Sequence, residues 1–235
     1  MPATEWAPTH RGAWPRPLED RSEAGRLLAE QLGHRRLSNP VVLGIPRGGV
    51  VVAYEIARRI GAPLDVLIVR KVGAPGDPEY GLGAVAEGGL VVIDERRARD
   101  AGFSREMLEP EIQRELEEVR QRGRRFRGDR LPPELAGRCA VLVDDGVATG
   151  GTVDAAIAVV REWHPASVVV ALGVAPPDAV ARLRGTADEV VVALIPPRLE
   201  AVGQWYRRFE PVEDTEVESL LARARAPSRP DQTPR

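Results

Sequence analysis

The chain has 235 residues, 43% of them hydrophobic, which is enough for one α/β domain with a full core and too little for two roomy domains. The 33 basic and 35 acidic residues nearly cancel, and a net charge of −2 gives no overall field favouring nucleic acid or a membrane. The single cysteine, Cys139, excludes an intrachain disulfide framework. Because no apolar stretch reaches membrane-spanning length and the N-terminus lacks a signal peptide's apolar core, we expect a soluble, cytoplasmic protein without a membrane partner.

Strand and helix patterns alternate along the chain. Apolar, β-branched runs predict strands over residues 41–45, 64–69, 82–87, 90–93, 140–143, 167–175 and 189–194. Helical spacing and end signals predict helices over residues 20–33, 50–60, 153–163, 178–184 and 215–225, and a charged helix pair within 94–130. The strands at 82–87 and 90–93 form a hairpin, of which one strand could join the main sheet. This alternation predicts an α/β fold with a mainly parallel central sheet of about five strands, flanked by helices.

The domain boundaries follow from composition. Residues 1–19 lack periodicity and are expected to form an N-terminal arm, whereas 20–222 form the folded domain. Within that domain we interpret 94–130 as a charged helical insertion on the surface and not in the core. Its basic stretch, residues 120–127, could contact a phosphate-rich partner, but the preceding glutamates can pair with these arginines, so we do not expect nucleic acid. The Pro- and Arg-rich residues 223–235 are expected to be a disordered tail.

The central feature of the sequence is the strand 140–143, which ends in two adjacent carboxylates, Asp144 and Asp145. A loop of small residues then leads into the next helix: Gly146, Val147, Ala148, Thr149, Gly150, Gly151 and Thr152. A strand, a glycine loop and a helix start direct backbone N–H groups at one point, which suits a phosphate. The carboxylates suit hydroxyl groups, or a hydrated divalent cation, on the same ligand. Ribose 5-phosphate has this layout.

A second strand–loop–helix junction repeats the pattern. Pro46, Arg47, Gly48 and Gly49 follow the strand at 41–45, so this loop predicts a second anion site to which Arg47 adds charge. Arg70 and Lys71 follow the next strand, and the loop after them contains Gly73, Pro75, Gly76 and Pro78. We interpret this loop, which runs through Gly81, as a lid that excludes water. In open α/β sheets ligands bind beyond the carboxyl ends of the strands, where these loops lie.

The run Val-Leu-Val-Asp-Asp-Gly-Val-Ala-Thr-Gly-Gly-Thr resembles the phosphoribosyl-diphosphate (PRPP) signature of type I phosphoribosyltransferases, which have a Rossmann-like fold. The resemblance implies that Asp144 and Asp145 bind the ribose hydroxyls, that residues 146–152 complete the PRPP-binding loop, and that 148–152 surround the 5-phosphate. By the same resemblance Pro46, Arg47, Gly48 and Gly49 hold the leaving pyrophosphate. Arg70 and Lys71 contribute charge to the diphosphate, and Glu79 lies near the acceptor base.

The resemblance also implies a reaction and its cofactor. It implies transfer of ribose 5-phosphate from PRPP to an aromatic nitrogen acceptor, a nucleobase, with Mg²⁺ held mainly by substrate and water and no dedicated protein metal site. Ala148 stands where hypoxanthine–guanine enzymes usually have aspartate, so that specificity loses support. Residues 195–212 are a candidate hood in which Trp205 or Tyr206 either stacks on the acceptor or packs the C-terminal helix. A homodimer and a non-catalytic PRPP- or nucleotide-binding regulator remain open.

Overall fold

The computed structural model describes residues 15–148 and 150–226, apart from the side chain of Glu79. Most of the predicted arm, most of the predicted tail and Thr149 therefore lie outside the described residues. Within the described ranges, no helix combines the length and apolarity needed to cross a membrane.

Five parallel strands form the main sheet, as the alternating pattern predicted. In spatial order they are β2 (Leu64–Val66), β1 (Val41–Gly44), β6 (Cys139–Gly146), β7 (Ser167–Val174) and β8 (Glu189–Leu194). The central strands β1 and β6 are buried along Val41–Gly44 and through Val143, which explains their unbroken apolar runs. The sequence placed the β6 strand at 140–143, but the ladder continues through Asp144 to Gly146 because β7 still offers partners there.

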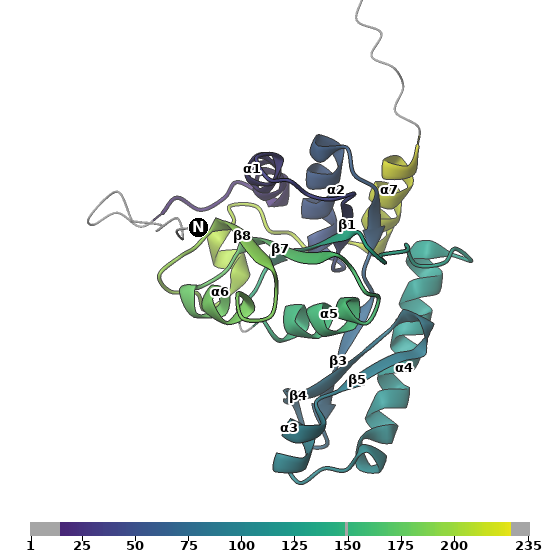
Figure 1. The fold of residues 1–235 in the computed structure, drawn as a ribbon. Helices are drawn as coiled ribbons and strands as arrows, with labels where there is room; N and C mark the ends of the chain where they lie inside the picture. The colour runs from purple at the N-terminus through teal and green to yellow at the C-terminus, as the bar shows by residue number, and fades with distance from the viewer. Residues whose placement is uncertain (1–14, 149, 227–235) are drawn as a thin grey trace, which may run out of the picture.

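Helices cover both faces of this sheet (Figure 1). On one face lie α1 (Arg21–Gly33), α2 (Gly48–Ile60) and α7 (Asp214–Arg225); on the other lie α5 (Gly151–Arg161) and α6 (Pro177–Leu183). The carboxylate of Asp20 caps α1 by accepting the Glu23 N–H at 2.9 Å. Gly61 ends α2 in the left-handed conformation, φ 68°, which glycine adopts without steric cost.

The chain order creates a topological switch point between β1 and β6. From β1 the chain passes through α2 to β2 on one side, and from β6 it passes through α5 to β7 on the other side. The helices that follow these two neighbouring strands therefore lie on opposite faces of the sheet (Figure 1). In doubly wound folds this switch point is where ligands bind. Both predicted anion loops begin here.

A second, antiparallel sheet projects from the main one. It contains β3 (Val69–Ala74), β4 (Asp77–Ala86) and β5 (Leu90–Ile93), with a 3₁₀ turn, η1 (Glu87–Gly89), between the last two. Two predictions are therefore wrong: the 64–69 strand stops at Val66, and the glycine- and proline-rich stretch is a strand pair and not a loop. Neither strand of the predicted hairpin joins the main sheet. Gly73 faces Pro78 across a register shift, so these residues mark a bulge near a tight turn.

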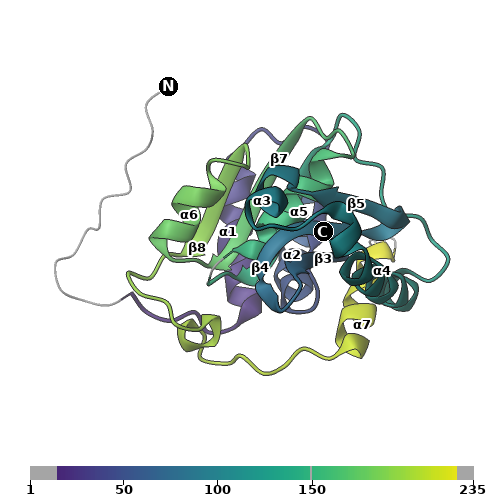
Figure 2. The same cartoon turned by 90° about the horizontal axis from the view of Figure 1, so that it is seen from below.

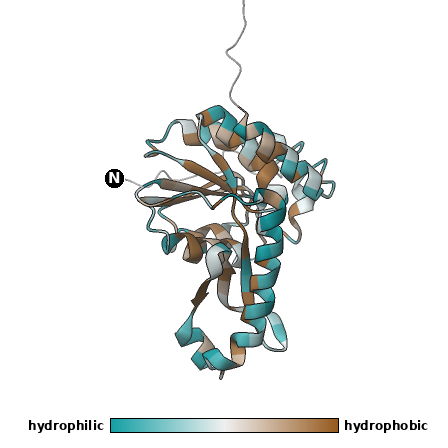
Figure 3. Ribbon diagram, turned by 90° about the vertical axis from the view of Figure 1, so that its right-hand side faces the viewer, coloured by the Kyte–Doolittle hydropathy of each residue, from teal (hydrophilic) through white to brown (hydrophobic). Residues whose placement is uncertain are grey.

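The predicted helix pair is α3 (Glu95–Asp100) and α4 (Arg105–Arg127). The expectation that this stretch stays out of the core is wrong for α4, because one face of the helix is buried. Leu108, Ile112 and Leu116 belong to the same core cluster as Val72 and Val85 of the small sheet. The outer face of α4 is hydrophilic, as Figure 3 shows.

The basic end of α4 is engaged by acids from other parts of the chain. Arg127 is 4% exposed and pairs with Asp65 of β2 and with Glu87 of η1. Arg125 pairs with Asp214 at 2.6 Å and with Glu218 at 3.1 Å, both in α7. These contacts tie α4 to the main domain.

The small sheet lies against α5, on the side away from the main sheet. Helix α5 contacts both β3 and β4, and Val153 and Ile157 share a core cluster with Val69, Ala84 and Ala86. Figure 2, seen from below, shows β4, β5 and α3 in front of α5. Helix α5 is thus enclosed between two sheets, and Thr152 is its one exposed residue.

Candidate active site

Two predicted site segments meet at the switch point. Gly44 of β1 is in register with Val143 of β6, so the loop of residues 46–49 lies beside the two aspartates that follow Val143. A Cβ atom on Gly48 would come within 1.9 Å of Asp145 Oδ2, and one on Gly49 within 2.5 Å of the Val143 carbonyl oxygen. Only glycine permits this close approach. The structure therefore brings together the predicted pyrophosphate loop and the predicted ribose-binding carboxylates.

Asp145 is held by an arginine that sequence analysis did not identify. Arg21, in the first turn of α1, places Nε 2.7 Å from Asp145 Oδ2, and the two side chains are only 12% and 15% exposed. The Arg21 guanidinium also donates to the Glu210 carbonyl oxygen at 2.9 Å and lies 3.8 Å from the centroid of the Phe209 ring. Its spacing of 124 residues from Asp145 left no local pattern to find.

The two carboxyl groups are shifted toward protonation. Burial raises the pKa of Asp144 well above its usual value, and the neighbouring Asp145 carboxylate raises it further. Burial also raises the pKa of Asp145, opposed by the hydrogen bond and charge of Arg21. Asp144 Oδ1 accepts the Asp145 N–H at 2.9 Å, which orients the first carboxylate. Two neighbouring acids of raised pKa suit hydrogen bonding to a polyhydroxy ligand.

The 195–212 segment packs over this end of the sheet. It contains a 3₁₀ turn, η2 (Val202–Trp205). The Val202 side chain packs against Gly146, where a Cβ atom would lie only 2.6 Å from it. The Tyr206 hydroxyl donates to the Asp145 carbonyl oxygen at 2.6 Å, while the Tyr206 ring stacks on Phe209 with centroids 5.0 Å apart. Trp205 and Tyr206 are both buried, so of the two roles considered for them the structure supports packing.

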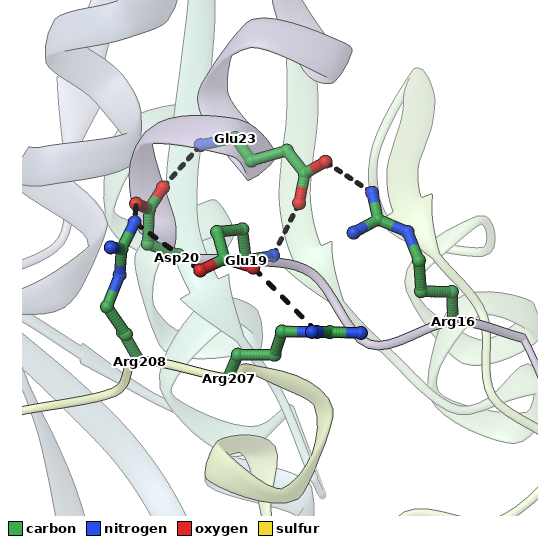
Figure 4. Close-up of polar contacts among 6 residues, drawn as sticks. All are labelled: Arg16, Glu19, Asp20, Glu23, Arg207 and Arg208. Atoms are coloured by element: carbon green, nitrogen blue, oxygen red, sulfur yellow. Dashed lines mark hydrogen bonds and ion pairs between the residues drawn. The ribbon is translucent and has the colours of Figure 1, made fainter.

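Ion pairs fasten this segment to the start of α1 (Figure 4). Arg208 donates to Asp20 Oδ2 at 2.6 Å, and Arg207 and Arg208 both approach Glu19. The backbone adds a further connection between the two segments, because Leu18 and Tyr206 form a β-bridge. Arg21 therefore extends from a helix start that is tied to the candidate hood on one side and to Asp145 on the other.

The candidate phosphate loop, residues 146–152, is flanked by two cationic side chains. Gly150 has φ 77°, a left-handed conformation that glycine favours, and the Arg182 side chain of α6 lies 2.1 Å from where its Cβ would be. Lys71 passes between Gly81 and Gly151. Lys71 was expected at the diphosphate, whereas sequence analysis missed Arg182. Ala148 and Thr152 are exposed, whereas Val147 is buried and belongs to the core cluster on the α5 side of the sheet.

Two of the predicted cations, Arg47 and Arg70, lie near acidic side chains. Arg70 and Lys71 lie within β3, where alternation sends their side chains apart. Arg70 donates to Glu115 of α4 at 2.8 Å, in a cavity of about 320 Å³ that also reaches Lys71 and Thr152. Arg47 is 46% exposed and turns toward Asp214 at 3.9 Å. Pro46 precedes Arg47 in the loop and is half-buried.

The described residues contain no group of three or more His, Cys, Asp or Glu side chains able to hold a metal ion. Hard divalent cations take oxygen ligands, and at this site the oxygens on offer are those of Asp144 and Asp145. Two adjacent carboxylates fit a cation whose remaining ligands come from a bound phosphate and from water.

Comparisons with known proteins agree with this geometry. The model of the phosphoribosyl transferase domain matches residues 19–199. Proteins from two Mycobacterium tuberculosis strains, each named "Putative phosphoribosyl transferase", are 45% identical over 209 residues, covering 88% of this chain and 47% of theirs. The chain thus spans about half the length of these relatives. The crystal structure of TT1426 from Thermus thermophilus superposes with a TM-score of 0.82 at 49% identity, covering 88% of this chain and 98% of that one. The chain belongs to the phosphoribosyl transferase domain family.

Proposed function

We propose that the chain transfers ribose 5-phosphate from PRPP to a nitrogen nucleophile, a nucleobase, with release of pyrophosphate. One observation carries the proposal: two glycine-lined loops and a pair of carboxylates converge at the switch point between β1 and β6. PRPP needs two anion sites separated by a diol site, and the loops at 46–49 and 146–152 flank Asp144 and Asp145 in that order. Membership in the phosphoribosyl transferase domain family supports the same substrate.

In this proposal the acceptor nitrogen forms a bond to ribose C1 while the bond from C1 to the diphosphate oxygen breaks. The electron pair leaves with pyrophosphate, and the sugar is cation-like between the two events. Asp144 and Asp145 hold the ribose hydroxyls, and their negative charge favours the developing positive charge on the ring. Backbone N–H groups of residues 47–49, with Arg47 and Lys71, receive the growing negative charge of the leaving group.

Mg²⁺ would be held by the substrate's phosphate oxygens and by water, next to Asp144 and Asp145, and would neutralise the diphosphate. This fits the two-carboxylate site described above. Arg70, which Glu115 holds, adds charge at the edge of the phosphate loop. Glu79 stays a candidate for contact with the acceptor base.

The test is pyrophosphate release from PRPP and Mg²⁺ across a panel of purine and pyrimidine bases. We expect release with at least one base, and loss of both PRPP binding and release in Asp144→Asn/Asp145→Asn. Circular dichroism should show that the double variant is folded. Binding of PRPP without release for any base would favour a non-catalytic PRPP-binding regulator, and unchanged binding in the double variant would refute the site.

A further inference from the structure

Asp145, one of the two acids of the candidate ribose site, is held both by its side chain and by its backbone. Its carboxylate accepts from Arg21 Nε at 2.7 Å, and its carbonyl oxygen accepts from the Tyr206 hydroxyl at 2.6 Å. Because Tyr206 is only 5% exposed, its hydroxyl bonds to this carbonyl oxygen and not to bulk water. The proposed reaction uses the Asp145 carboxylate but assigns no role to Tyr206.

Both contacts come from one small structural unit, which is made of residues 18–21 and 205–210. Backbone hydrogen bonds join its two segments: the Leu18 N–H donates to the Trp205 carbonyl oxygen at 2.9 Å, and the Arg207 N–H donates to the Leu18 carbonyl oxygen at 2.8 Å. The ion pairs drawn in Figure 4 join the same two segments. This unit therefore fixes the donors of both contacts relative to each other.

Phe209 connects the two contacts within this unit. Its ring stacks on the Tyr206 ring, with centroids 5.0 Å apart and planes inclined by 22°, and Arg21 Cζ lies 3.8 Å from its centroid. A guanidinium group over an aromatic face is attracted by the negative charge of that face. The Arg21 guanidinium also donates to the Glu210 carbonyl oxygen at 2.9 Å. The 205–210 segment thus holds Arg21 in the orientation in which it reaches Asp145.

The Tyr206 hydrogen bond also depends on a glycine in β7. A Cβ atom on Gly173 would lie 2.0 Å from the Tyr206 hydroxyl oxygen and 2.4 Å from the Asp145 carbonyl oxygen. Glycine weakens the interior of a strand and often marks a place where another group approaches closely. Here the missing side chain leaves the space in which the hydroxyl meets the carbonyl oxygen.

We propose that Tyr206 and Phe209 are positioning residues for the ribose-binding carboxylate. Tyr206 acts through the backbone of Asp145, and Phe209 acts through Arg21. Together they hold the carboxylate in place before the ligand arrives, which lowers the ordering cost of binding the ribose hydroxyls. This role rests on the proposed function, because it requires that Asp145 binds the diol of PRPP. It gives the candidate hood a function at the sugar.

The test is isothermal titration with PRPP and, separately, with inorganic pyrophosphate, both in the presence of Mg²⁺. Tyr206→Phe removes the hydroxyl and keeps the stacked ring. We expect it to weaken PRPP binding about fivefold or more, while pyrophosphate, which has no diol, binds as in the wild type. A merely structural role of Tyr206 would weaken both ligands alike. Tyr54→Phe is the matched control, since it removes a hydroxyl from a half-buried tyrosine of α2 whose ring faces Arg223.

A pair of substitutions tests Phe209 in the same titrations. Phe209→Leu removes the aromatic face under Arg21 and should weaken PRPP binding about threefold or more. Phe209→Tyr keeps that face and should retain the wild-type affinity. Gly173→Ala should reproduce the effect of Tyr206→Phe from a different strand, because the added Cβ displaces the hydroxyl.

Unchanged PRPP affinity in Tyr206→Phe would overturn the role of Tyr206, and unchanged affinity in Phe209→Leu would overturn that of Phe209. An equal loss of PRPP and pyrophosphate affinity would overturn both roles. Binding of PRPP by the wild type without release of pyrophosphate for any base would refute the proposed transfer, but it would leave these binding comparisons valid. The positioning role and the proposed function can therefore fail separately.

Discussion

Arg21 Nε lies 2.7 Å from Asp145 Oδ2, so a residue at the start of the first helix holds a carboxylate at the end of the sixth strand. Because the pair is nearly buried and Phe209 covers the guanidinium, the contact is not a flexible surface ion pair. It fixes the orientation of Asp145 and opposes the upward pKa shift that burial imposes on it.

Arg21→Gln should therefore weaken PRPP binding and change its pH dependence. Without Arg21 the pKa of Asp145 rises further, so the acid limb of the profile should move to higher pH. We expect KM for PRPP to rise about tenfold or more, since a charge-assisted hydrogen bond is lost. Arg21→Lys keeps the charge and should retain the wild-type acid limb. Arg26→Gln, further along α1, is the control, and a profile equal to that of Arg21→Gln would contradict this role.

Asp144 should limit the stability of the ligand-free protein. Its folded-state pKa is raised, so the folded state binds its proton more tightly than the unfolded chain does, and stability falls as pH rises through that interval. Asp144→Asn keeps an oxygen for the Asp145 N–H. We expect it to raise Tm at pH 7 by about 2–4 °C for each 1 kcal/mol gained, while PRPP binding is lost. Thermal melts at pH 4 and pH 7 should show a gain only at the higher pH.

Gly49→Ala should damage the site by sterics alone. The added Cβ would lie 2.5 Å from the Val143 carbonyl oxygen and 2.9 Å from Asp144 Cα, both backbone atoms that cannot move aside cheaply. We expect a loss of stability of about 1–3 kcal/mol in urea unfolding, together with weaker PRPP binding. Gly33→Ala is the matched control, because nothing lies within 4 Å of its Cβ position. A neutral Gly49→Ala would mean that the two loops do not approach this closely.

Arg127→Met should weaken the attachment of α4 to the main domain and so destabilise the protein. It leaves the carboxylates of Asp65 and Glu87 buried without their cation. Loss of one partner from a buried charge cluster costs about 3–5 kcal/mol, which urea unfolding can measure. Arg120→Met removes a pair whose side chains are 54% and 55% exposed, and should cost less than about 1 kcal/mol. Equal costs for the two variants would argue that the cluster is solvated.

The sequence predicted the features that depend on short stretches of consecutive residues. The apolar runs around Val42 and Val141 gave the parallel sheet, and the glycines at 48–49 and 150–151 marked two loops that the strand register then brings to one edge. The family resemblance is likewise confirmed by the match over residues 19–199. These features could be predicted because burial and close backbone approach each restrict which residue types a position accepts, and such a restriction is visible without knowing the distant contacts.

What could not be predicted depends on contacts between distant segments. The pairing of Arg21 with Asp145 and that of Arg182 with Asp154 join surface-type residues whose spacing carries no period. The β3–β4 ribbon was mistaken for a loop because Gly73, Pro75, Gly76 and Pro78 are turn formers. Their actual positions, at a bulge and a turn, are set by the pairing of Val72 with Gly83 and of Ala74 with Asp77.

The enclosure of α5 between two sheets restricts how the protein can respond to a substrate. Because α5 begins at Gly151, the end of the candidate phosphate loop cannot shift without repacking Val153 and Ile157. A helix that is close-packed on both sides in this way is held rigidly in place. Any closing movement on substrate binding therefore has to come from segments free of that packing, such as the exposed tip of the β3–β4 ribbon at residues 75–78.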